Sequence, residues 1–322
     1  MRRFLARRVA HGAAVIFIAA SLSFALVHLA PGDPFSGSVT SPGFDPETAR
    51  LRRSQYGLDR PLLQQYVTFM GHLAVGNLGQ SIRHGRPVSE VLGSALPRTL
   101  LLMGTALVLS FAAGVALGAW QATRRGSRAD RVAGATSLVV ASLPEFWLGL
   151  VLLLVFTYKL PLFPGGGIVG YMHDSLSPLG QLIDRVRHLA LPSLTLAALG
   201  TATIARFQRA ALLDVLPQDF VRTARAKGVT ERWVVYRHAL RNALVPTIVL
   251  AGLSLPTLFG GAVFVESVFS WPSMGLEAAA AFAARDYPLV VGTALVGAVM
   301  VVIGGMITDV LHAAVDPRVR AR

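Results

Sequence analysis

The chain has 322 residues, of which 53% are hydrophobic and 15% are charged, and its formal net charge is +13. Soluble domains typically carry about 25% charged residues, so this composition favours a membrane protein. The chain contains no cysteine, which excludes disulfides, thiolate metal sites and cysteine nucleophiles. The Gly-x-x-x-x-Gly-Lys-Ser/Thr loop that cradles nucleotide phosphates is absent, as are the His-Glu-x-x-His and Gly-x-Ser-x-Gly patterns. The sequence therefore predicts a non-catalytic chain with no cofactor or metal site of its own.

Several apolar stretches exceed the length of about 18 residues that marks a spanning helix. They predict an all-α integral membrane protein with a single transmembrane domain over residues 1–322. The first stretch follows Arg7 and Arg8 and is longer than a signal-peptide core, so we interpret it as a retained signal anchor. The six predicted spans cover residues 9–30, 97–123, 132–158, 189–213, 243–265 and 288–313.

Prolines in or near these spans predict where helices end or bend. We expect Pro97, Pro192 and Pro246 at or near helix ends, whereas Pro144 lies inside the third span and predicts a kink there. Glu145 follows it, and a charge inside a membrane span is rare. Its carboxylate either lines a substrate pathway or bonds to a neighbouring helix or to backbone freed by the kink.

Three more residues lie near predicted span ends. Glu266 lies at the outer end of the fifth span, where a surface role is favoured over a gate or docking role, and Asp309 is expected to be interfacial near the inner end of the last span. Trp271 lies in a turn where an interfacial anchor is the ordinary role of tryptophan.

The orientation follows from the basic residues. With the N-terminus inside, 19 of the 30 lysines and arginines fall in cytoplasmic segments, as the positive-inside rule requires. Both termini are then cytoplasmic. The charge of +13 thus reflects topology and contact with anionic lipid rather than a nucleic-acid surface.

A long outer segment, residues 31–96, separates the first two spans. It contains a predicted amphipathic helix, with Asp59 as the N-cap and Pro61 in the first turn. The helix either lies on the outer leaflet or forms a docking platform or lid over a pore, and we favour a mixture of the two, a structured cap packed on the spans. Its apolar stripe consists of Leu62, Tyr66, Met70 and Leu73.

The most informative segment is the basic region between the fourth and fifth spans, residues 217–241, which we call the coupling segment. Pro217 cannot continue the preceding helix, and Asp219 is the predicted N-cap of a new one. Gly228 suits the left-handed position past a helix end, and Lys227 suits the negative end of the helix dipole. These signals predict a helix of about two turns, followed by a second start at Thr230.

The faces of this short helix indicate its role. Phe220, Ala224 and Gly228 share one face, and Arg222 points elsewhere. Small residues are poor lipid anchors but allow a close protein contact, so a protein partner is favoured over a loop resting on headgroups. The small residues expected to be exposed are Thr223, Ala224, Ala226 and Gly228.

The ordered motifs of the chain resemble those of ABC importer permeases of the dipeptide/oligopeptide group. The run Arg222-Thr223-Ala224-Arg225-Ala226-Lys227-Gly228, followed by residues 237–246, is similar to their cytoplasmic coupling motif, although Arg222 stands where the common form has glutamate. Further similar stretches are residues 30–34, 56–61, 142–149, 269–272, 284–288 and 316–318.

The resemblance implies the first, B-type permease of a peptide importer in the bacterial cytoplasmic membrane, with type I architecture and six transmembrane helices. The implied partners are a second permease, two ATPase subunits that hold ATP and magnesium, and an extracytoplasmic substrate-binding protein. The implied pathway or kink residues are Pro144 and Glu145. The residues implied in coupling to the ATPase are Asp219, Phe220, Arg222, Thr223, Ala224, Lys227 and Gly228.

Two alternatives stay open at this point. The same importer chassis carries other cargo, such as nickel chelates, glutathione or heme. A stand-alone secondary transporter is the other class, and the coupling segment together with the missing ATP motif argues against it.

Overall fold

The computed structural model describes residues 2–29, 59–254 and 262–315, together with residues 47, 50, 51, 54 and 57. Side chains are described from Arg8 to Thr308 within these ranges. The chain divides into two compact units. The first comprises Met1–Arg98 and Ser273–Val302, and the second comprises Thr99–Pro272 and Ile303–Arg322.

The regular structure of the described residues is helical, apart from one isolated bridge between Gln80 and Pro87. The unit boundary falls within α4 and within α13. The first unit holds α1 (Arg2–Leu29), α3 (Leu62–Ala74), the start of α4 (Val88–Thr123), α12 (Met274–Ala283) and the first part of α13 (Tyr287–Val315). The second unit holds α5 (Arg128–Ser142), α6 (Glu145–Leu153), the π-helix η2 (Leu154–Lys159), the 3₁₀ turn η3 (His173–Ser175), α7 (Pro178–Val215), α8 (Asp219–Ala226), α9 (Glu231–Trp233), the π-helix η4 (Val234–Ala239), α10 (Leu240–Ser254) and α11 (Val263–Val268).

Four described helices are long and apolar enough to cross a membrane, or five if a bent pair forms one span. The all-α membrane prediction is therefore confirmed, whereas the count of six is not reached. Helix α10 has 15 residues, and the predicted span 243–265 continues over residues 255–261, which lie outside the described part of the chain. The four long helices are Arg8–Leu29, Val88–Thr123, Pro178–Val215 and Tyr287–Thr308.

Helices α4 and α7 begin well before the spans predicted from residues 97 and 189. Helix α4 starts at Val88 and α7 at Pro178, where the Ser177 hydroxyl accepts a hydrogen bond from Gly180 N at 3.3 Å. The expectation that prolines mark helix ends was therefore wrong, because Pro97, Pro192 and Pro246 lie inside helices. A helix in a membrane bundle tolerates the lost bond when neighbouring groups satisfy the freed carbonyl.

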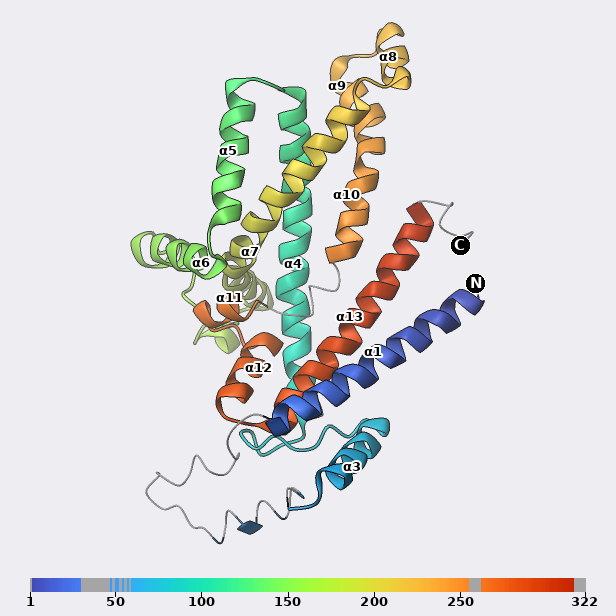
Figure 1. The fold of residues 1–322 in the computed structure, drawn as a ribbon. Coiled ribbons are helices and arrows are strands. Elements are labelled where there is room, and N and C mark those ends of the chain that lie inside the picture. The colour runs from blue at the N-terminus through green and yellow to red at the C-terminus, as the bar shows by residue number, and fades with distance from the viewer. Residues whose placement is uncertain are drawn as a thin grey trace. The chain divides into compact units, whose positions relative to one another are not determined.

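The kink predicted at Pro144 is a complete break. Helix α5 ends at Ser142, α6 begins at Glu145, and the two axes differ by 103°. Figure 1 shows α6 turning away from the end of α5. Pro144 precedes the first residue of α6, where its missing N–H leaves no bond unmade.

In the first unit, α3 packs against α1 as the predicted cap. The Tyr66 hydroxyl lies 2.8 Å from the Ser21 hydroxyl, and its ring meets Phe24 edge-on at 5.3 Å. Met70 and Leu73 pack with Phe69 around a core of α1 and α13 residues, so most of the predicted stripe is confirmed. Two details were wrong. Leu62 is 61% exposed, and Pro61, not Asp59, is the N-cap residue, because the helix begins only at Leu62.

A buried carboxylate anchors the start of α13. Asp286 is fully buried and accepts hydrogen bonds from the Ser81 hydroxyl at 2.5 Å, Arg83 N at 2.9 Å and Leu289 N at 3.2 Å. The bond from Leu289 makes Asp286 a helix cap, and the other two bonds tie the segment before α4 to that cap.

In the second unit, two expected surface residues are buried. Glu266 is fully buried, accepts a hydrogen bond from Ala262 N at 3.1 Å and does not lie at the surface. Trp271 is 1% exposed and is therefore not an interfacial anchor. Its backbone N–H donates to the Glu266 carbonyl at 2.8 Å, while Gly167 N donates to the Phe269 carbonyl at 2.9 Å. These bonds close the turn before Trp271 and tie it to the backbone at Gly167.

Some sequence predictions fall on residues whose structure is not described. They concern the Asp309 side chain, the stretches 30–34 and 316–318, and residues 56 and 58.

Candidate functional site

The coupling segment lies beyond the ends of α7 and α10, where Figure 1 shows α8 and α9 grouped together. Helix α7 ends at Val215, and α8 runs for eight residues from Asp219 to Ala226, which confirms the predicted two turns. The N-cap prediction was wrong by one position. Gln218 is the N-cap residue without a side-chain cap bond, and Asp219 is the first helical residue. There its carboxylate still favours the positive end of the helix dipole.

Gly228 ends the turn after α8 as predicted. Its φ of +75° lies in the left-handed region, and Gly228 N donates to the Arg225 carbonyl at 3.0 Å. A Cβ built at this position would meet nothing within 4 Å. Position 228 therefore faces open space and is restricted by backbone conformation alone.

The inner face of α8 is packed into the second unit. Val221 is fully buried and Ala224 is 8% exposed. They share one apolar cluster with residues from the ends of α4, α7, η4 and α10, namely Ala119, Ala122, Leu212, Val234, Val235, Ala239 and Ala243. Burying a valine side chain contributes about 1.5–3 kcal/mol. Helix α8 is thus joined to these helix ends as one body.

This packing corrects one sequence prediction. Ala224 points into the core and away from any partner, because it lies three residues after Val221 on the same apolar face. Phe220, predicted to share its face, is 39% exposed. The i, i+3 spacing of Val221 and Ala224 was the signal that could have revealed the inner face.

The other face of α8 is open. An ion pair between Arg222 and Asp219 at 3.5 Å lies on it, and both side chains are so exposed that the pair contributes little stability. Thr223 donates its hydroxyl to the Asp219 carbonyl at 2.9 Å, so it stabilises its own helix. The residues of the predicted coupling set on this open surface are Asp219, Phe220, Arg222, Thr223, Lys227 and Gly228.

An ion pair closes the turn between α8 and α9. Arg225 donates from Nε and Nη2 to the two Glu231 carboxylate oxygens at 3.0 and 2.7 Å. These hydrogen bonds hold the pKa of the Glu231 carboxyl below its ordinary value of 4.5 and that of the Arg225 guanidinium above its ordinary range. The sequence predicted a helix start at Thr230, with Glu231 in its first turn, but it did not predict this pair.

We expect Glu231→Gln to weaken the turn slightly. Because the two side chains are 41% and 62% exposed, the loss at about neutral pH should stay below about 1 kcal/mol. The folded-state pKa of Glu231 is lowered, so the pair stabilises the fold above pH 4.5, and this contribution is lost as the pH falls through the folded-state value. Thermal unfolding of both proteins across this range checks the expectation. A difference that persists after the carboxylate is protonated would contradict it.

Pro144 and Glu145 lie far along the sequence from this segment, at the break between α5 and α6. The Glu145 side chain is partly buried in the first turn of α6. Among the described residues it has no hydrogen-bond or ion-pair partner, so the hypothesis of a bond to a neighbouring helix gains no support there. A pathway role stays a prediction.

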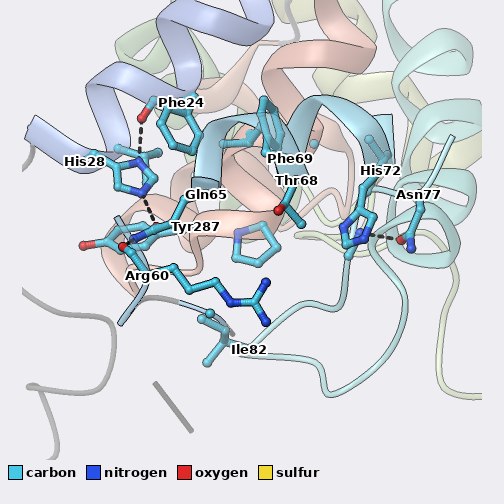
Figure 2. A pocket seen from close by; sticks show the side chains of 17 residues that line it. Phe24, His28, Arg60, Gln65, Thr68, Phe69, His72, Asn77, Ile82 and Tyr287 are labelled. Atoms are coloured by element: carbon cyan, nitrogen blue, oxygen red, sulfur yellow. Dashed lines mark hydrogen bonds between the residues drawn. The ribbon is translucent and has the colours of Figure 1, made fainter. Parts of the chain in front are cut away.

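The first unit contains a separate hollow of about 230 Å³ between α1, α3 and the start of α13. Figure 2 shows Phe24, Phe69 and Arg60 among the side chains that line it. His28 donates from Nδ1 to the Phe24 carbonyl at 2.8 Å, and its Nε2 lies 3.0 Å from the Gln65 amide oxygen. The hollow is mainly apolar and holds no catalytic grouping. In the part of the chain that the structure describes, no three His, Asp or Glu residues gather into a metal-binding cluster.

Comparison with known proteins identifies the family. Residues 114–321 match the family described as binding-protein-dependent transport system inner membrane component, and residues 1–103 match its N-terminal component. The chain belongs to this family. It is 38% identical to the oligopeptide transport system permease protein AppB of Bacillus subtilis, with 99% of each chain covered. It is 35% identical to the dipeptide permease DppB of Escherichia coli K12 and 36% identical to the glutathione permease GsiC of E. coli O6:H1, again with 99% of each chain covered.

The protein is thus a permease subunit of an ABC importer and a component of the inner membrane. As a permease it is a non-catalytic part of a system that also requires a substrate-binding protein and an ATPase.

Proposed function

We propose that this permease is the B-type subunit of an importer of di- and oligopeptides and that α8 is its coupling helix. Full-length similarity to peptide permeases supports the cargo class. The observation that carries the coupling role is the division of α8 into a face buried among the ends of α4, α7 and α10 and a face open to a partner.

The mechanism follows from that division. An ATPase subunit holding ATP and magnesium binds the open face, which consists of Asp219, Phe220, Arg222, Thr223, Lys227 and Gly228. Because Val221 and Ala224 share one core with the ends of α4, α7 and α10, a displacement of α8 moves those ends with it. Packed cores resist gradual deformation, so the motion passes to the helices as a rigid-body change between inward-open and outward-open states.

The proposed assembly is a heterodimer with a second permease, on two ATPase subunits and beneath an extracytoplasmic binding protein. This chain contributes one transmembrane domain of six spans with both termini cytoplasmic. The excess of arginine in the inner segments supports the orientation. Glu145 at the α5–α6 break is the proposed pathway residue.

Co-expression with the genomic neighbours tests the proposal. We expect the chain to co-purify with an ATPase and a second permease, and the reconstituted complex to take up peptide only with ATP and the binding protein. Transport by the isolated chain down an ion gradient would overturn the importer reading.

Glutathione is the second candidate cargo, because one relative is a glutathione permease. Uptake of a labelled dipeptide, challenged with unlabelled glutathione, separates the two. Competition only by peptides supports the peptide importer, and uptake of labelled glutathione with no dipeptide uptake contradicts it.

A further inference from the structure

A basic and aromatic surface of the second unit combines the C-terminal part of the coupling segment with the end of α4. Two arginines stack on tryptophans, Arg124 over Trp120 at 5.0 Å and Arg237 over Trp233 at 5.2 Å. Such cation–π contacts hold the guanidinium flat against an apolar ring while leaving its edge free to donate hydrogen bonds. We call the following residues the basic–aromatic surface: Trp120, Arg124, Arg232, Trp233, Tyr236 and Arg237.

The local sequence forces these side chains outward. Val234 and Val235 are buried in the apolar cluster that also holds α8. Trp233 and Tyr236 flank this buried pair at i, i+3 spacing and face away from the core, so that Trp233 is 55% and Tyr236 49% exposed. Exposed aromatic side chains that gather into one patch mark a protein or membrane interaction site.

Two adjoining hollows run along this surface. One is lined by Arg232, Trp233, Tyr236 and Arg237. The other shares Arg232 and Tyr236 with the first and extends to Trp120 and Arg124. The second also reaches Arg225 and Glu231, so the surface is continuous with the ion pair that closes the turn after α8.

The basic–aromatic surface carries an excess of positive charge. Glu231 is the only acid that lines either hollow among the described residues, and it is already paired with Arg225. Arg124, Arg232 and Arg237 form no ion pair within the described chain. Among the residues that the structure describes, these three cations beside indole and phenol rings therefore have no anionic partner.

The position of the basic–aromatic surface near the ends of predicted spans indicates what kind of partner it binds. Trp120 lies in the last turn of α4, and Trp233 to Arg237 lie just before α10, so both groups fall at the predicted inner ends of spans. Tryptophan and tyrosine favour the headgroup level of a membrane, and anionic lipids of the cytoplasmic leaflet attract arginine there. We propose that the basic–aromatic surface binds the headgroup of an anionic phospholipid of the inner leaflet. The inference rests on the proposed orientation but not on the cargo.

The complete importer complex provides the test. It is purified, placed in nanodiscs of phosphatidylcholine with phosphatidylglycerol, and the retained phosphatidylglycerol is counted by native mass spectrometry. At about 1 kcal/mol for each interfacial arginine, the double variant Arg232→Gln/Arg237→Gln should bind phosphatidylglycerol roughly 30-fold more weakly than wild type. Retention of phosphatidylcholine should not change, because that lipid has no net charge.

The matched control is Arg128→Gln/Arg131→Gln, which removes the same charge from two exposed arginines of α5 on the same predicted side of the membrane. It should retain phosphatidylglycerol as wild type does. If the double variant does not assemble, the single Arg232→Gln variant replaces it, and its affinity for phosphatidylglycerol should fall about fivefold.

Two outcomes overturn the inference. In the first, the double variant keeps wild-type phosphatidylglycerol. In the second, the double variant sheds its ATPase subunits to the same extent with and without anionic lipid, which would make this surface a protein interface. Lipid retention is measured apart from uptake, so failure here leaves the importer function standing.

Discussion

Gly228→Glu should abolish transport-coupled ATP hydrolysis while the permease still inserts and folds. The position has φ of +75° and no neighbour within 4 Å, so the new side chain extends into the space where the proposed ATPase contact forms. A non-glycine residue in this backbone conformation costs about 1–2 kcal/mol, which is too little to unfold the chain. Steric and charge conflict at the partner surface is therefore the expected cause. ATPase activity of the reconstituted complex, with substrate-loaded binding protein present and absent, measures the effect, and we expect a loss of at least about tenfold.

Two controls separate strain and charge from lost coupling. Gly228→Ala carries the backbone strain without the bulk and should retain most coupled hydrolysis. Gly126→Glu places the same side chain at a second glycine of similar φ, +77°, which also has nothing within 4 Å but lies in the turn before α5. It should leave coupling largely intact. Normal coupled hydrolysis in the Gly228→Glu complex would remove α8 from the role of coupling helix.

Asp130→Asn should destabilise the second unit by about 3 kcal/mol, because it breaks a largely buried ion pair. Asp130 is 4% exposed and accepts hydrogen bonds from Arg209 Nε at 2.9 Å and Nη2 at 2.8 Å. It also accepts a hydrogen bond from Gly126 N at 3.0 Å. These bonds fix the start of α5 to α7. Loss of the charge leaves the Arg209 guanidinium poorly compensated, and the melting temperature should fall by roughly 6 °C.

A double-mutant cycle identifies the interaction. Asp130→Asn and Arg209→Gln should each lower the free energy of unfolding. The double variant should lower it by clearly less than the sum of the two single effects, because the second change removes the uncompensated charge. Asp214→Asn, an exposed acid further along α7, is the matched control and should change stability by less than about 0.5 kcal/mol. Additive losses in the cycle would show that the pair does not act as a unit.

Most helices of this permease were predictable because each depends on local chemistry. Long apolar runs required spanning helices wherever backbone groups had to be satisfied without water. Gly228 ended α8 as predicted because only glycine adopts its left-handed conformation readily. The existence of a break at Pro144 was predictable for the same local reason.

The failures share a different cause. The orientation of Ala224 depends on Val234, Val235 and the ends of three helices, none of which is local to α8. Glu266 and Trp271 are buried because their loop is folded inward and Gly167, about a hundred residues earlier, bonds to Phe269. Pattern reasoning assigned these residues to the surface because their partners are distant in the chain.

The sequence by itself determined the helical class, the membrane environment, the predicted orientation and the short capped helix of the coupling segment, since hydropathy, charge and turn chemistry act over a few residues. The tertiary structure alone decided the 103° angle at the α5–α6 break, the pairing of Asp130 with Arg209 and the face that α8 leaves open. Each of these depends on which side chains meet after folding, and those partners are distant in the chain, so no local pattern specifies them.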